Sequence, residues 1–519
     1  MSLLIDLLNQ GPIPWLNSAP AGDDRPRLVF AGSALDHWSS ALAAGLNAET
    51  ELAGALGEVF ACVASDIAAE PELAARIQHA LQLTTGASGW PVLAVCTPEG
   101  EIFGALPWRP MHEVTQILLQ AAEAWHERPA DCRADAARIA AAWQAIHQPG
   151  AGRPLRPELL LDAAESAAME IADTLEGGFG PAPRTAEPAL WGFLVQRAAR
   201  EDAPLALLQQ VERSLAALCA GAAHDHLAGG FFAGCIDAAW SEPSCAKRLA
   251  DQALLADLLL TAGERLGNQL WREVALRALR FACVTLRRGD GNFAHGLHAD
   301  SPAAPGRWEE GACYRWSATE VADVVGEAGA QLVCRRFALP AEGVGFLAVG
   351  EALSTAEQRR LPELVNRLAV ARAERPQPRR DESVYPIEQA QIAFALERAA
   401  LIEPEFALVA DALTPQLTSV EPWTGRALAA RWRRLNVPQP LALVCAEQGV
   451  EGDLDPRAGF APTAVLAHLR LDLGELTGEN RWTEQVDQAI ARARDRLRAA
   501  PLACAGLLGV LDRRAHTQP

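Results

Sequence analysis

Residues 228–265 read AGGFFAGCIDAAWSEPSCAKRLADQALLADLLLTAGER, a glycine-rich loop followed by apolar residues at helical spacing. The same alternation recurs along the rest of the chain, where glycine-rich loops at 176–180 and 289–297 also interrupt helical patterns. Strand-like alternation is scarce there. About a dozen helices with long loops at one set of ends predict an all-α toroid of helical hairpins, with an irregular α-solenoid as the alternative. The absence of a fixed-period repeat favours the toroid.

The helical pattern covers most of the chain after residue 157. The segments with helical spacing are 158–175, 188–200, 204–220, 246–265, 268–287, 355–373, 386–400, 461–476, 481–498 and 501–512. Long runs of this kind, joined by loops, are typical of packed antiparallel helices. We therefore expect the toroid to occupy residues 158–519.

Residues 1–147 carry a different pattern, in which short apolar strands alternate with helices. The expected strands and helices are 27–31, 36–57, 58–64 and 71–83, then an apolar strand between Pro91 and the turn at 98–100, and a helix at 110–145. This β-α-β-α-β order, with a strand beginning after Pro91, predicts a compact α/β domain. The Pro- and Gly-rich segment 148–157 predicts a linker between the two domains.

Composition excludes several classes of function. The formal net charge is −19 and no cluster of basic residues is present, which argues against nucleic acid as a partner. The N-terminal residues lack a secretory pattern, and no apolar run is long enough to span a membrane. We therefore expect a cytoplasmic protein without a membrane partner. The 11 cysteines include no Cys-x-x-Cys pair, so they are expected to be buried apolar residues. No cofactor is expected.

Lys247 is the one lysine among 46 basic residues, and the others are arginine. Surface lysines are readily replaced by arginine when composition drifts in that direction. A compact ammonium group whose pKa responds to burial is, however, something that arginine does not offer. We therefore expect Lys247 to meet a specific structural or chemical demand.

Several stretches carry a family likeness. They are Gly89-Trp90-Pro91, Gly177 to Arg184, Ala228 to Asp251, Phe293 to Ser301 and Glu310 to Trp316. On these stretches the chain resembles the YyaL-type, spermatogenesis-associated protein 20-like family. The resemblance implies a thioredoxin-like domain joined to a six-hairpin (α/α)6 toroid, of the sort found in sugar epimerases and glycosidases.

The chain departs from this family at its reactive positions. Where the family carries Cys-His-Trp-Cys, this chain has Asp36-His37-Trp38-Ser39. Thiol–disulfide exchange needs a thiolate nucleophile and a resolving thiol, so the degenerate site at Asp36 and Ser39 excludes that activity. After Pro243 the family's His-Phe-Glu is replaced by Ser-Cys-Ala at 244–246. That replacement removes the best candidates for general acid and base.

This chain retains polar and aromatic residues of the family pattern, and we expect them to face one central cavity. If the chain is an enzyme, the candidate catalytic carboxylates are Asp225, Asp237, Asp251 and Glu310. The candidate ligand-binding residues are Trp240, Lys247, Asp300, Tyr314 and Trp316. The alternative is structural: Asp237 and Asp251 would cap helices and pair with Lys247.

Histidines gather in two loops of the toroid. They are His224 and His226 in the first loop and His295 and His298 in the second. Two histidines beside a carboxylate can hold a divalent metal. The alternative is that these are solvated loop histidines, and no metal is assigned to the chain.

Two functions follow from these patterns. The first is a non-catalytic pseudoenzyme, a binding or scaffold protein that takes a protein partner or a small, sugar-like ligand in the toroid. The second is a carbohydrate-active enzyme, a sugar isomerase, epimerase or glycoside hydrolase that uses the retained carboxylates. A cavity plugged by Leu227 and Phe232 would favour the first, and an open acidic cavity the second. The losses from both domains favour the first.

Overall fold

The computed structural model describes residues 3–147, 155–447 and 462–516. Contacts divide the chain into two compact units, Met1–Gln148 and Pro149–Pro519. The linker expected at 148–157 lies mostly outside the described residues. No described helix combines the length and the apolar character needed to cross a bilayer.

A four-stranded sheet organises the first unit. Its strands are β1 (Arg27–Gly32), β2 (Ala61–Asp66), β3 (Val92–Cys96) and β4 (Ile102–Pro107). The order in the sheet is β2-β1-β3-β4, with β1 parallel to β2 and with β3 antiparallel to both β1 and β4. This is the thioredoxin-like arrangement expected from the sequence.

Helices cover both faces of this sheet. They are α1 (Leu3–Leu8), α2 (His37–Ala48), α3 (Thr50–Val59), α4 (Pro71–Thr85), α5 (Met111–Glu127) and α6 (Pro129–His147). Successive side chains of β1 point to opposite faces. Leu28 and Phe30 therefore join the core formed with α1, α2 and α5. Val29 and Ala31 join the core formed with α4 and α6.

A closed ring of six inner helices forms the centre of the second unit. They are α8 (Pro188–Ala198), α10 (Leu249–Arg265), α15 (Pro386–Ala399), α17 (Pro422–Leu435), α19 (Pro462–Thr477) and α21 (Ala505–His516). Each packs against the next in this order, and α21 packs back against α8. The ring therefore closes, as a toroid requires and an open solenoid does not.

A second layer of helices packs outside the ring. These helices are α7 (Pro157–Glu170), α9 (Leu205–Ala220), α11 (Gln269–Phe281), α16 (Glu405–Leu413), α18 (Pro440–Glu447) and α20 (Asn480–Ala499). Each contacts an inner helix, with α7 on α21 and α20 on α19. Inner helices such as α15 are buried on nearly every side, whereas α20 buries only one stripe. The expected (α/α)6 architecture is thereby observed.

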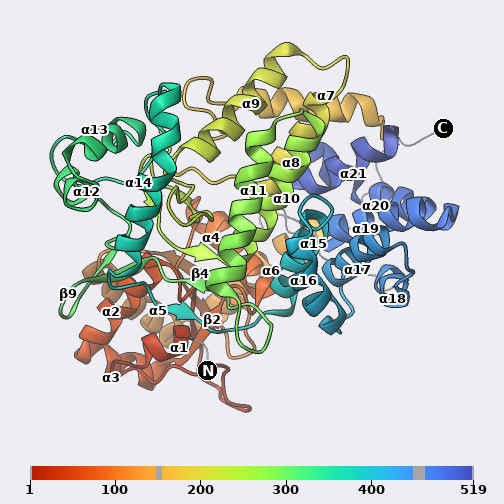
Figure 1. The fold of residues 1–519 in the computed structure, drawn as a ribbon. Coiled ribbons are helices and arrows are strands. Elements are labelled where there is room, and N and C mark those ends of the chain that lie inside the picture. The colour runs from red at the N-terminus through yellow and green to blue at the C-terminus, as the bar shows by residue number, and fades with distance from the viewer. Residues whose placement is uncertain (1–2, 148–154, 448–461, 517–519) are drawn as a thin grey trace. The chain divides into compact units, whose positions relative to one another are not determined.

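An insertion separates α11 from α15. It contains the hairpin β9 (Asp300–Ala304) and β10 (Arg307–Glu310), and the helices α12 (Ala318–Val325), α13 (Glu327–Arg336) and α14 (Thr355–Ala373). These three helices share a small core of their own and lie together at one side of the second unit (Figure 1). Short loop strands complete the unit: β5 (Gly234–Cys235), β6 (Pro243–Ser244), β7 (Lys247–Arg248), β8 (Gly296–Leu297) and β11 (Arg380–Asp381). The remaining short elements are a π-helix at Ala282–Leu286 and 3-10 turns at Thr414–Gln416 and Leu502–Cys504.

Candidate functional site

Lys247 lies on β7, immediately before α10, and its side chain is 1% exposed. Its Nζ lies 2.5 Å from Oδ2 of Asp225 and donates to the carbonyl oxygen of Gly229 at 3.0 Å. The ring centroids of Phe281 and Phe232 lie 4.3 and 4.8 Å from Nζ. Burial lowers the pKa of Lys247 to about 8, although the charge of Asp225 opposes this shift. The lysine therefore forms a buried ion pair inside an aromatic cage.

Asp225 is shared between two cations. Its Oδ1 accepts a hydrogen bond from Nη1 of Arg372 at 2.7 Å, and it also accepts one from the backbone N–H of Leu227 at 3.0 Å. Burial alone would raise the pKa of Asp225, but Arg372 and Lys247 hold it well below its usual range. Asp225 is therefore an ionised structural centre that joins the loop after α9 to β7 and α14.

The glycines of the motif allow this loop to approach α10 and α11 closely. Gly230 has φ +79°, and a Cβ there would lie 2.5 Å from the ring of Phe281. The side chain of Gln252 on α10 forms hydrogen bonds with both backbone polar groups of the next residue, Phe231. It accepts from the backbone N–H of Phe231 at 2.7 Å and donates to its carbonyl oxygen at 2.8 Å. These contacts set the position of Asp225 relative to Lys247.

Very little space remains around this cluster. A cavity of about 10 Å³ is lined by Asp225, Phe232, Tyr314 and Arg372 together with neighbouring loop residues. That volume is about the space that one water molecule occupies. The motif carboxylate is therefore enclosed by packing, as expected for a plugged site.

Asp237 and Asp251 do not meet Lys247, so the expected pairing is wrong. Asp237 closes its own loop by accepting from the backbone N–H and the hydroxyl of Ser241 at 3.1 and 2.6 Å. Asp251, in the first turn of α10, accepts from Nε of Arg248 at 2.7 Å. The demand on Lys247 is met by Asp225, which sequence spacing did not select.

The remaining motif residues do not line the large cavity of the helix ring, contrary to the expected common site. Glu310 accepts from the backbone N–H of Cys245 at 2.9 Å. Trp240 and Trp316 are each 1% exposed and belong to apolar cores. Tyr314 packs edge-on against Phe232 beside the Lys247 cluster. These side chains act in packing and loop geometry.

The four loop histidines are buried, so the expectation that they are solvated is wrong. Nε2 of His226 lies 3.0 Å from the carbonyl oxygen of Gly221, and burial lowers its pKa to about 4. Nδ1 of His295 lies 2.9 Å from a carboxylate oxygen of Glu388. The backbone N–H of Asp300 donates to Nδ1 of His298 at 2.8 Å. Among the described residues, no group of three or more His, Cys, Asp or Glu is arranged to hold a metal.

The degenerate redox position serves as a helix cap. Asp36 is the N-cap of α2 and accepts from the backbone N–H and the hydroxyl of Ser39 at 2.7 and 2.9 Å. Ser39 is fully buried. Cys62 and Cys96 lie in the strands β2 and β3, and burial raises the pKa of each to about 12. The cysteines of this domain are therefore the apolar core residues that the sequence indicated.

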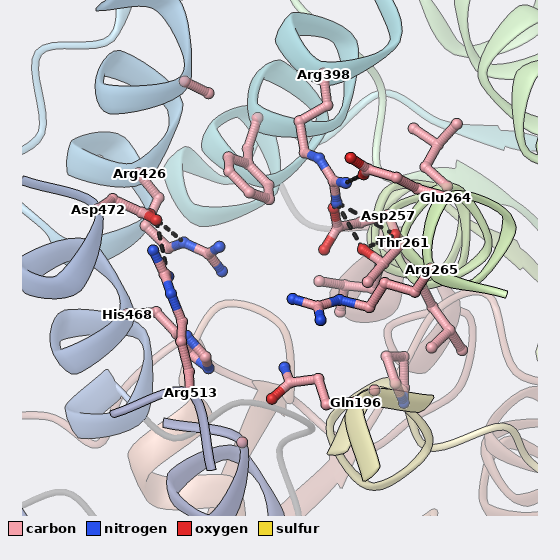
Figure 2. Close-up of a pocket in the computed structure, with 18 of the residues that line it drawn as sticks. Gln196, Asp257, Thr261, Glu264, Arg265, Arg398, Arg426, His468, Asp472 and Arg513 are labelled. Carbon is pink, nitrogen blue, oxygen red and sulfur yellow. Dashed lines mark hydrogen bonds and ion pairs between the residues drawn. The ribbon is translucent and has the colours of Figure 1, made fainter. Parts of the chain in front are cut away.

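The large cavity of the second unit lies elsewhere, inside the helix ring. It has a volume of about 570 Å³ and receives side chains from all six inner helices. Its polar and charged lining residues are Gln196, Asp257, Thr261, Glu264, Arg265, Arg272, Glu397, Arg398, Arg426, Arg433, His468, Asp472, Glu475 and Arg513. Figure 2 shows the labelled side chains of this set arranged around an open centre.

This cavity and the Lys247 cluster lie at different ends of α10. Lys247 precedes the first turn of that helix, whereas Asp257, Thr261 and Arg265 line the cavity from its second half. At 1.5 Å per residue, the first and last residues of α10 are about 24 Å apart. The family motif and the cavity are therefore separate features.

Ion pairs connect the cavity wall. Arg398 forms an ion pair with Asp257 and donates to the hydroxyl of Thr261 at 2.8 Å. Nη1 of Arg513 lies 2.9 Å from Asp472. Burial raises the pKa of Asp472 by itself, yet the arginines around it lower the value to about 2. The wall is therefore charged and held in place by its own pairs.

None of these cavity residues was predicted from the sequence. One local signal was available, because His468 and Asp472 are polar residues four apart in the largely apolar run 461–476. Residues four apart share one face of a helix. No comparable local signal brings Arg265, Arg426 and Arg513 together, since they lie on three different helices.

Comparison with known proteins finds a family match within the first unit. Residues 13–144 match the family model described as "Thioredox_DsbH: Protein of unknown function, DUF255". Spermatogenesis-associated protein 20 of Homo sapiens is 25% identical over 331 residues, which cover 60% of this chain and 42% of the human protein. The Mus musculus protein of the same name is 24% identical over the same shares. The matched part thus spans under half the length of these relatives.

Solved structures that are similar to part of the chain at low identity include an epimerase and a glycoside hydrolase. Cellobiose 2-epimerase from Spirochaeta thermophila DSM 6192 is 12% identical, with a TM-score of 0.38, over 70% of this chain and 99% of that one. A family 76 glycoside hydrolase from a bovine Bacteroides thetaiotaomicron strain is 11% identical, with a TM-score of 0.33, over 70% and 78%. The family matches confirm the resemblance read from the sequence motifs. The chain thus matches the DUF255 model over residues 13–144 and is similar to spermatogenesis-associated protein 20 over 60% of its length.

Proposed function

We propose that this chain is a non-catalytic binding protein that takes a small ligand in the central cavity of its helix ring. The observation that carries the proposal is the cavity of about 570 Å³, to which all six inner helices contribute. Pockets that bind small molecules commonly have volumes of roughly 300–1,000 Å³ and mix apolar walls with a few fixed polar groups. Apolar side chains such as Phe193, Leu258 and Phe394 supply the apolar part of this wall.

The state of the motif carboxylates supports a role without catalysis at that site. A general acid or base must come within hydrogen-bond reach of a substrate proton. Asp225 is 4% exposed and is engaged by both Lys247 and Arg372. The space beside it is about 10 Å³, which is far too small for a sugar ring.

The first unit supports the same view. Thiol–disulfide exchange requires a reactive thiolate. At the position of the family's dithiol, Asp36 caps α2 by accepting hydrogen bonds from the backbone N–H and the hydroxyl of Ser39. Both units thus retain the architecture of the family without the reactive groups that its motifs usually carry.

Isothermal titration calorimetry tests the proposal. The full chain is titrated with glucose, glucuronate and glucose 6-phosphate, and the same panel is incubated with the protein to detect epimerised or hydrolysed products. We expect saturable binding of one molecule per chain for at least one probe, and no conversion. Conversion of any probe that depends on the motif carboxylates would contradict the proposal.

A cavity-filling variant tests whether the ligand binds in the central cavity. A Cβ at Gly509 on α21 would lie no closer than 3.7 Å to any other group, so Gly509→Leu extends into the cavity without a backbone clash. We expect this variant to lose binding. The matched control is Gly289→Leu, which enters open space outside the cavity and should bind as the wild type does. Failure of all three probes to bind, or equal binding by both variants, would overturn the proposal.

A further inference from the structure

The wall of the central cavity carries an excess of arginine, although the whole chain has a net charge of −19. The lining arginines are Arg265, Arg272, Arg398, Arg426, Arg433 and Arg513. The lining carboxylates are Asp257, Glu264, Glu397, Asp472 and Glu475. Glu397 is held by Arg431 and Arg434, which do not line the cavity, at 3.2 and 2.5 Å. Its charge is therefore already compensated from behind the wall.

Asp472 faces three guanidinium groups at once. Its carboxylate oxygens lie 2.9 Å from Arg513, 3.5 Å from Arg426 and 3.9 Å from Arg433. Glu475 adds a second carboxylate, 2.8 Å from Arg433, and it also pairs with Arg513. Two carboxylates thus serve three arginines at this side of the cavity, so one positive charge is left uncompensated.

Arg426 is the least satisfied of these three. Its side chain is 11% exposed and stacks on the ring of Phe394, with 4.2 Å from Cζ to the ring centroid. Its buried Nε has no hydrogen-bond partner, because the oxygen of Asp472 at 3.5 Å makes an ion pair without hydrogen-bond geometry. Figure 2 shows the two terminal nitrogens of Arg426 directed into the open centre. A guanidinium stays charged and its N–H groups only donate, so these nitrogens are available to a hydrogen-bond acceptor on a ligand.

Arg265 approaches the same open space from the other side. It is the last residue of α10, and Figure 2 shows its side chain extended into the cavity toward the side that carries Arg426. Among the residues that the structure describes, Arg265 has no ion-pair or hydrogen-bond partner. Two guanidinium groups that face the same space repel each other, and an anion between them would turn that repulsion into attraction.

Two polar side chains complete the centre. Burial and the charges of Arg426 and Arg513 lower the pKa of His468 to about 3, so its imidazole is neutral at physiological pH. Gln196 extends into the cavity from α8, and its buried Oε1 has no hydrogen-bond partner (Figure 2). Neutral groups of this kind suit ligand hydroxyls, which can both donate and accept.

We propose that the central cavity binds a small hydroxylated organic anion, with its oxyanion held between Arg265 and Arg426. This inference rests on the proposed binding function and names the class of ligand. A carboxylate and a phosphate both offer the paired oxygens that an arginine fork recognises. The ligand body places its hydroxyls against Gln196 and His468.

The test compares probes that share one body and differ in charge. Glucose 6-phosphate, glucuronate, glucose and inorganic phosphate are titrated separately into the full chain by isothermal titration calorimetry. We expect at least one of the two anionic sugars to bind tenfold or more tightly than glucose, and more weakly as salt rises. The ranking of glucose 6-phosphate against glucuronate distinguishes a phosphate ligand from a carboxylate ligand.

The variant Arg265→Gln tests the assigned contact. Because Arg265 is exposed and unpaired, its replacement should leave the melting temperature unchanged while weakening the anionic sugar roughly tenfold. Arg426→Gln provides the second arm and is checked for folding by circular dichroism. The matched control is Arg360→Gln, which changes an exposed arginine of α14 outside the cavity and should bind as the wild type does.

The outcomes separate this inference from the proposed function. Glucose binding as tightly as the anionic sugars, with binding lost in Gly509→Leu, would overturn the inference and leave the proposed function standing. Unchanged affinity for the anionic sugar in Arg265→Gln would also overturn the inference. Absence of binding by every probe would overturn both. Binding of inorganic phosphate as tight as that of the sugar phosphate would refute the role given to the hydroxylated body.

Discussion

Replacing Lys247 with methionine tests whether this lysine holds the motif loops together. The change keeps a side chain of similar length but removes the Nζ that lies 2.5 Å from Asp225 and 3.0 Å from the carbonyl oxygen of Gly229. Breaking a buried ion pair on one side costs about 3–5 kcal/mol. Asp225 keeps its contact with Arg372 at 2.7 Å, so we expect a loss of about 3 kcal/mol, at the lower end of that range.

The opposite change should cost more. Asp225→Asn leaves Lys247 and Arg372 buried together without a carboxylate between them. We therefore expect a loss of about 5 kcal/mol, at the upper end of the range for a broken buried pair. The double variant Asp225→Asn with Lys247→Met should be more stable than Asp225→Asn alone, because it removes one of the two facing cations.

Urea unfolding followed by circular dichroism measures these free energies, and thermal melts give a second readout. At roughly 2.1 cal/mol/K per residue over the second unit, 3 kcal/mol corresponds to a fall in Tm of about 4 °C. The control is Arg360→Met on the exposed face of α14, which should stay within about 0.5 kcal/mol of the wild type.

Two results would refute the reasoning. If Lys247→Met lowered the free energy of unfolding by less than about 1 kcal/mol, the ion pair would not stabilise the fold in the way described. If Lys247→Met lost as much as Asp225→Asn, Arg372 would not share the charge of Asp225. The structure instead predicts that the free energy of unfolding falls from the wild type to Lys247→Met, that the double variant is close to Lys247→Met, and that Asp225→Asn is the least stable.

Three further predictions follow from buried groups. The pKa of His468 is about 3 in the folded chain against 6.5 when unfolded, so the unfolded state binds more protons between these values and stability falls as pH is lowered from 6.5. At pH 5 this histidine alone should cost about 2 kcal/mol in urea unfolding relative to pH 7, and His468→Gln should remove that part of the pH dependence. Burial raises the pKa of thiols such as Cys62 to about 12, so a thiol reagent at pH 8 should rapidly label no more than the half-buried Cys283 and Cys334. Labelling of all 11 cysteines should require denaturant. Rapid labelling of further thiols in the folded chain would contradict the described core. Arg197 pairs with carboxylates on α7 and α21 from α8, so Arg197→Met should lower the free energy of unfolding by about 3–5 kcal/mol, and an unchanged urea midpoint would show that this junction does not help to close the ring.

Local patterns predicted most of the secondary structure. The helical segment expected at 246–265 corresponds to α10, and that at 386–400 to α15. The helix expected at 36–57 is instead two helices, α2 and α3, which meet at Glu49. The pattern did not single out α17, because its inner face carries Arg426 and Arg433 where an apolar stripe would otherwise mark a buried helix.

The site was predicted less well, for a physical reason. Lys247 stood out by composition alone, and its burial agrees with a specific demand. Its partner Asp225 lies 22 residues away in the sequence, and Arg372, which also pairs with Asp225, lies 147 residues from that aspartate. Sequence spacing selected Asp251 instead, because helical periodicity reports only neighbours three or four residues away.

The sequence by itself determined the two classes of architecture, the loss of the dithiol at Asp36 and Ser39, and the singular status of Lys247. These features need no tertiary contacts, since each depends on the periodicity or identity of residues within a segment, or on the composition of the whole chain. Only the tertiary structure decided that the ring closes between α21 and α8, that the motif carboxylate is enclosed, and that arginines from different helices converge on one cavity. Such convergence arises when elements distant in sequence pack together, and no local pattern encodes it.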